Sequence, residues 1–162
     1  MMSDKAKLRR YEDDLNVSGT GIVIMGAWSI VKLIMDLFLE SKEYFAFEAD
    51  SKFEYAFGVT FVLIFVAIIS LIVIKIHLYI GLNAIKASKG REHKKGYFAG
   101  SVIILIIMVL CLLFYIEKFQ DIDNIDTTIS ALLVDLTTIY ILAVVVISTV
   151  KIKKLRKKML QE

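Results

Sequence analysis

Four long apolar stretches, separated by polar segments, dominate the pattern of this 162-residue chain. They cover about residues 19–39, 57–80, 97–116 and 128–150. A helix rises 1.5 Å per residue, so about 20 apolar residues are enough to cross a hydrocarbon layer of ~30 Å. The pattern therefore predicts an all-α integral membrane protein, a bundle of four transmembrane helices.

The polar segments predict no further domain. None has the composition of a linker that would divide the chain, so we expect residues 1–162 to form one transmembrane domain. Residues 3–15 carry Leu8, Tyr11 and Leu15 at helical spacing, which predicts a short helix on the headgroups or, equally, a frayed polar tail. The first apolar stretch is about twice as long as a signal-peptide core, so we expect a retained membrane helix.

Composition supports a membrane protein and gives no sign of catalysis. The chain is 57% hydrophobic, and its mean hydropathy is +0.68. The single cysteine, Cys111, rules out an internal disulfide and any two-cysteine redox or zinc motif. A phosphate loop, a serine elbow and a metalloprotease helix are all missing from the sequence. We therefore expect a protein that is not an enzyme and holds neither a cofactor nor a metal.

Charge is strongly segregated along the chain. Fifteen Lys and Arg residues lie in 1–18, 81–96 and 151–162, whereas 40–56 and 117–127 hold three and are rich in acids. By the positive-inside rule, we expect both termini and the basic turn 81–96 to face the cytoplasm. We also expect the chain to lie in the plasma membrane.

The basic tail 151–162 is expected to continue the last helix and to contact anionic lipid headgroups, with no nucleic acid as partner. The residues that carry this expectation are Lys151, Lys153, Lys154, Arg156, Lys157 and Lys158.

Two charged residues on different predicted helices lie at the same depth. Lys32 comes seven residues before Leu39, and Asp135 comes seven residues after Thr128 on a helix that enters from the opposite direction. Both therefore lie roughly 10 Å below the outer ends of their helices. Each costs about 2.5–3.5 kcal/mol near a helix centre, and pairing offsets much of this cost. The sequence thus predicts an intramembrane Lys32–Asp135 ion pair.

The surroundings of this pair follow from helical spacing. Asp36, one turn from Lys32, is expected as a second acceptor for the ammonium group, with Glu117 at the outer rim of the cluster. Trp28, Ser29 and Thr138 are expected to flank the pair. By contrast, Lys75 and His77 lie near the cytoplasmic surface, where we expect both side chains to face the headgroups. Gly19, Gly26, Ala27 and Gly100 are expected to allow close helix approach.

These residues leave two interpretations open. In the first, the chain is an oligomeric, accessory or regulatory membrane subunit, and the pair fixes helix packing or docks a partner, which is a second copy or part of a larger membrane complex. In the second, it is a small transporter or channel for cations or protons that uses the same charged residues.

Overall fold

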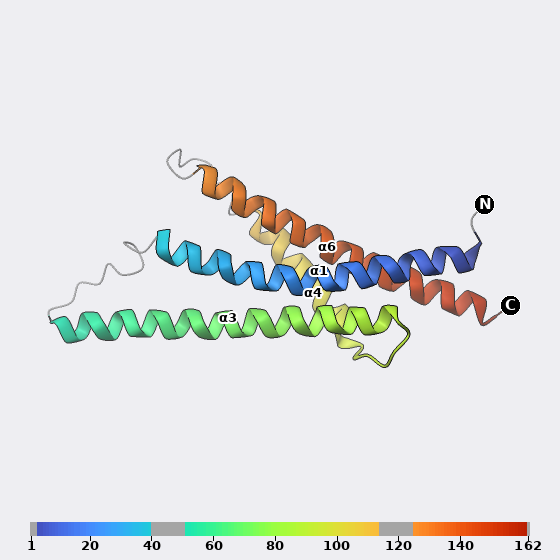
Figure 1. Cartoon of the computed structure of the whole chain (residues 1–162), viewed down its shortest axis with the longest axis horizontal. Coiled ribbons are helices and arrows are strands. Elements are labelled where there is room, and N and C mark those ends of the chain that lie inside the picture. The colour runs from blue at the N-terminus through green and yellow to red at the C-terminus, as the bar shows by residue number, and fades with distance from the viewer. Residues whose placement is uncertain (1–2, 40–50, 114–124, 162) are drawn as a thin grey trace.

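A computed structural model describes residues 3–39, 51–113 and 125–161, and in these ranges the chain forms a bundle of helices (Figure 1). The helices are α1 (Asp4–Leu39), α3 (Lys52–Ser88), α4 (Gly96–Cys111) and α6 (Ile125–Met159). The helices α1, α3 and α6 are long and apolar enough to cross a membrane. The predicted fold class, an all-α bundle of membrane-spanning length, is confirmed.

The first helix is longer than predicted. α1 runs without interruption over 36 residues, so the expectation of a separate surface helix or a frayed tail over residues 3–15 is wrong. The reason is tertiary. The N-terminal part of α1 lies beside the C-terminal part of α6 (Figure 1), and Leu15 is only 1% exposed there. Burial against α6 stabilises turns that would be marginal alone.

The third apolar stretch forms the shortest helix of the described chain. α4 has 16 residues and is therefore about 24 Å long, which is less than the expected span over 97–116. It ends at Cys111, and Leu112 and Leu113 form a turn. Residues 114–124 lie outside the described part of the chain, so the expected end of this span is untested.

The helix α1 lies between two neighbours. It packs against α3 on one side and α6 on the other, and α4 packs against α6 and α3. Figure 1 shows α1 between the other two long helices and α4 behind them. The chain leaves α3 through Lys89 and Gly90 and returns in α4. Gly90 has a φ of 67°, a left-handed backbone conformation that glycine adopts without steric cost.

The hydrophobic core is concentrated at one end of the bundle. It consists of Leu15, Ile22, Ile80, Ala84, Ala87, Tyr97, Leu142, Val145 and Ile152. Both termini lie at this end, and α1, α3 and α6 separate toward the other end (Figure 1). The apolar side chains there are exposed, as for Phe61 and Leu71 on α3. The tightest packing is therefore at the basic end, and the opposite half presents apolar surface that suits a lipid environment.

Candidate functional site

The helices α1 and α6 are joined by an ion pair in their apolar region. Lys32 Nζ donates a hydrogen bond to Oδ2 of Asp135 over 2.8 Å. The side chains of Lys32 and Asp135 are 25% and 16% exposed. The contact predicted from equal depth is therefore present, and it lies in a region where charges need a partner.

The pair is positioned by two antiparallel helices. Lys32 lies in the second half of α1 and Asp135 in the first half of α6. These halves diverge in Figure 1. Packing between lipid-embedded helices gains little from the hydrophobic effect, because lipid tails are as apolar as the side chains. A charged hydrogen bond between the diverging halves consequently favours one relative arrangement.

The residues expected beside the pair have different environments. Ser29 and Thr138 donate their hydroxyl protons to carbonyl oxygens of their own helices, those of Met25 and Val134, each over 2.9 Å. Trp28 is 50% exposed, so much of its indole faces away from the protein. The side chain of Asp36 and the whole of Glu117 lie outside the described part of the chain, and their expected roles stay predictions.

The helices α1 and α3 approach most closely at glycine. A Cβ built on Gly81 would lie 2.6 Å from the carbonyl oxygen of Gly19, and a Cβ on Gly19 would lie 2.9 Å from the carbonyl oxygen of Gly81. The sequence indicated Gly19 but missed Gly81. Counting along the helices places Gly81 near the depth of Gly19, because Gly81 directly follows the second apolar stretch. Depth alone does not tell which faces of α1 and α3 meet.

The other expected small residues contribute unequally. Gly26 also lies in the close contact between α1 and α3, but Ala27 is exposed. A Cβ on Gly100 would lie 3.6 Å from Ile80, which is ordinary van der Waals contact. Of the four expected small residues, Gly19 and Gly26 lie at a close approach, and both are in the contact of α1 with α3.

His77 is placed differently from the prediction. A Cβ built on Gly26 would lie 2.5 Å from Cβ of His77 and 2.8 Å from its Cγ, so the histidine packs on the glycine at the α1–α3 contact. Its Nδ1 is 2.8 Å from the carbonyl oxygen of Val73, to which it donates. The expectation that His77 faces the headgroups is therefore wrong, because the missing side chain at Gly26 makes room for the ring. Lys75 is exposed, as expected.

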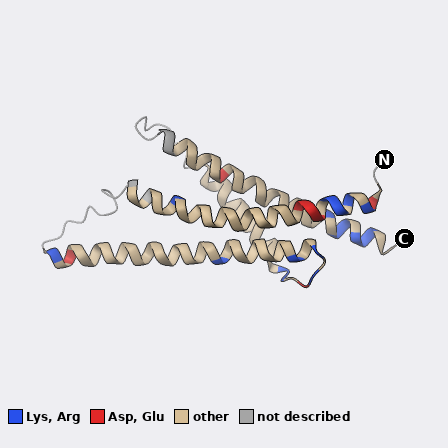
Figure 2. Ribbon diagram, viewed as in Figure 1, with Lys and Arg blue, Asp and Glu red and all other residues tan. Residues whose placement is uncertain are grey.

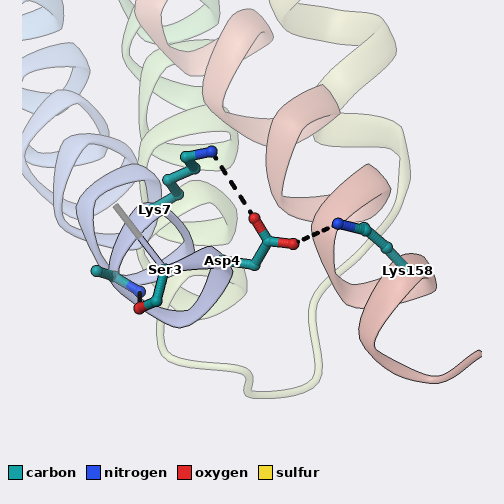
Figure 3. A network of polar contacts seen from close by, with 5 residues as sticks. Ser3, Asp4, Lys7 and Lys158 are labelled. Carbon is teal, nitrogen blue, oxygen red and sulfur yellow. Dashed lines mark hydrogen bonds and ion pairs between the residues drawn. The ribbon is translucent and has the colours of Figure 1, made fainter. Parts of the chain in front are cut away.

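At the basic end, ion pairs join the N-terminal part of α1 to the tail of α6. Asp4 accepts from Lys158 over 2.6 Å and lies 3.8 Å from Lys7 (Figure 3). Glu12 accepts from Arg156 over 2.7 Å. The hydrogen bond from Lys158 lowers the pKa of Asp4. Of the tail residues expected to contact lipid, Arg156 and Lys158 are thus bound within the chain, a role that local sequence could not reveal.

The basic turn is shorter than the predicted 81–96: α3 continues to Ser88, and residues 89–95 connect it to α4. A buried amide of α3 fixes this turn. Asn83 is 9% exposed; its Oδ1 accepts from the backbone N–H of Lys94 over 2.9 Å, and its Nδ2 donates to the carbonyl of Tyr79 over 2.7 Å. Beyond the turn, the hydroxyls of Tyr97 and Thr149 are 3.1 Å apart and link α4 to α6. The turn is held at two points, which places its cations beside the tail.

In the ranges that the structure describes, no three His, Cys, Asp or Glu side chains are grouped as metal ligands. Cys111 is a free, partly buried thiol. No protein-family model, curated protein or solved structure matches this chain.

Proposed function

We propose that this chain is a non-enzymatic membrane protein that works as an oligomer or as a small subunit of a larger membrane complex. In this proposal Lys32 and Asp135 determine how α1 packs against α6 and so set the surface that a neighbouring chain meets. The supporting observation is the 2.8 Å ion pair closed within one chain.

The physical argument concerns the cost of separation. Moving α6 away from α1 would leave an ammonium group and a carboxylate in an apolar environment without each other, which costs several kcal/mol for buried pairs. The pair therefore acts as a specific lock between helices that lipid alone would not orient. Beside this lock, α3 is apolar around its whole circumference and exposed over its first half, a surface suited to another membrane helix.

The proposed orientation places the basic end in the cytoplasm of a plasma membrane. It is supported by the positive-inside rule, since Lys and Arg gather at the end where both termini lie (Figure 2). Accessibility of single cysteines introduced at Ser3 and Glu92 to a membrane-impermeant thiol reagent, in a Cys111→Ser background, tests this orientation. Labelling of intact cells at these positions would contradict it.

The proposed lock is tested by charge exchange. Lys32→Asp and Asp135→Lys should each reduce the yield of folded protein, and the double variant should recover much of it, because the opposite charges meet again. A double variant no better than either single one would sink the proposal. The proposal that the chain works as an oligomer or as a subunit is tested by the mass of the purified particle in detergent, which should correspond to more than one copy or include a stoichiometric partner.

A second candidate function is cation or proton transport along a path lined by Asp135, Lys32 and Asp36. Its support is that the side chains of the pair are only partly buried by the protein, so that neither charge is fully enclosed between α1 and α6. Flux in proteoliposomes that is lost in Asp135→Asn would favour this function over the subunit role. Absent flux, together with rescue by charge exchange, would exclude it.

A further inference from the structure

The basic turn and the tail of α6 form one surface. A Cβ built on Gly90 in the turn would lie 3.9 Å from the guanidinium of Arg156 in the tail. The ammonium of Lys153 lies 5.0 Å from the ring centroid of Phe98 in the first turn of α4. Segments some 60 residues apart in sequence are therefore neighbours, and their cations gather at one end of the bundle (Figure 2).

The structure divides the cations of the tail into two groups. Arg156 and Lys158 are bound to Glu12 and Asp4 of α1. Lys151 and Lys154 are exposed, and neither forms an ion pair within the described residues. Arg156 and Lys158 therefore stabilise the contact between α1 and α6. The charges of Lys151 and Lys154 are available to a ligand.

The available cations lie at headgroup depth. Lys151 and Lys154 follow the end of the apolar stretch at Val150 by one and four residues, which is about 2 and 6 Å along the helix. The headgroup layer on each side of a bilayer is roughly 5–8 Å thick. On α3, Lys75 is exposed five residues before Ile80, and its flexible stem carries the ammonium toward the same layer.

We propose that this surface binds the headgroups of anionic lipids and that Arg156 and Lys158 are not part of it. The binding surface consists of the exposed residues Lys151, Lys153, Lys154 and Lys157 of the tail with Arg91, Lys94 and Lys95 of the turn. Lipid is favoured over a soluble acidic partner because the tail lysines begin directly where the apolar stretch ends. Lipid binding at this surface is separate from the proposed role of the Lys32–Asp135 ion pair and does not depend on it.

The two groups allow a charge-matched test. Lys151→Gln/Lys154→Gln and Arg156→Gln/Lys158→Gln each remove two positive charges from the same helix. The purified full-length chain in neutral detergent is titrated with phosphatidylglycerol and, separately, with phosphatidylcholine, and bound lipid is counted by native mass spectrometry. Inorganic phosphate and an RNA oligonucleotide serve as competitors, and thermal unfolding reports folding.

We expect the wild type to prefer phosphatidylglycerol. Because each cation near an anionic surface contributes about fivefold, Lys151→Gln/Lys154→Gln should weaken this binding about 25-fold without changing the unfolding midpoint. Arg156→Gln/Lys158→Gln should weaken it less than about twofold and lower the midpoint. Equal losses in the two variants, no preference between the lipids, or displacement by phosphate or RNA at equal concentration would overturn the proposal.

Discussion

Gly19 of α1 and Gly81 of α3 meet backbone to backbone, so that a methyl group on either would contact the carbonyl oxygen of the other at 2.6–2.9 Å. Such distances are below van der Waals contact, and the obstructing atom is a main-chain oxygen that cannot rotate away. The contact lies within the core at the basic end, beside the buried residues Ile22 and Ile80. The distance between α1 and α3 is therefore set by the absence of two side chains.

Gly81→Ala should destabilise the protein by about 1–2 kcal/mol, even though alanine is the better helix former. The added methyl group would meet the Gly19 oxygen and a methyl group of Val23, both at 2.6 Å, and α1 and α3 would have to move apart. Thermal unfolding in detergent measures the change. Gly100→Ala is the control, because its methyl group meets Ile80 at 3.6 Å and should be tolerated. Equal stability of the two variants would contradict the close contact.

Lys32→Met should cost about 2 kcal/mol of stability, because it leaves the Asp135 carboxylate without its cation in an apolar region. The estimate is below that for a fully buried pair, since both side chains are partly exposed. Lys32→Met/Asp135→Leu should recover most of the loss, because replacing both charges removes the cost of burying them. Chemical denaturation of the three variants measures the difference. A double variant as unstable as the single one would argue against direct coupling.

Acid should release the first turns of α1. The hydrogen bond from Lys158 holds the pKa of Asp4 below its usual value of 3.8. The contact therefore stabilises the folded state fully at pH values above 3.8. Its contribution is lost as the pH falls through the lower pKa of the folded protein. The protection factors of the amides in residues 4–10, that is, their exchange rates corrected for the intrinsic rate at each pH, should fall over this range. Asp4→Asn should show the lower protection already at neutral pH, and protection that stays constant with pH in the wild type would contradict the assignment.

Asn83→Ala should free the basic turn. The substitution leaves the N–H of Lys94 and the carbonyl of Tyr79 without their partners, at a cost of about 1–3 kcal/mol. Asn83→Asp is informative, because a carboxylate still accepts from Lys94 but cannot donate to Tyr79. Exchange of the Lys94 amide should therefore increase strongly in the alanine variant and less in the aspartate variant. Equal exchange in both would show that this hydrogen bond does not hold the turn.

The depth of a residue in the bundle could be predicted from the sequence, because depth depends only on counting residues along helices of known rise. This is why the contact of Lys32 with Asp135 could be predicted. Orientation around each helix was not within reach. The place of His77 on Gly26 and the neighbour of Gly19 depend on which faces of α1 and α3 meet, and α3 is too uniformly apolar to indicate a face.

The sequence by itself determined that this protein is helical, that it has helices of membrane-spanning length, and that its cations are segregated from its acids, because hydropathy and charge are properties of the chain alone. Only the tertiary structure decided that α1 continues to Asp4 and that Glu12 binds Arg156. The reason is that residues 144 positions apart become neighbours only when α1 and α6 pack side by side. A charge that looks available in the sequence is thereby neutralised within the fold.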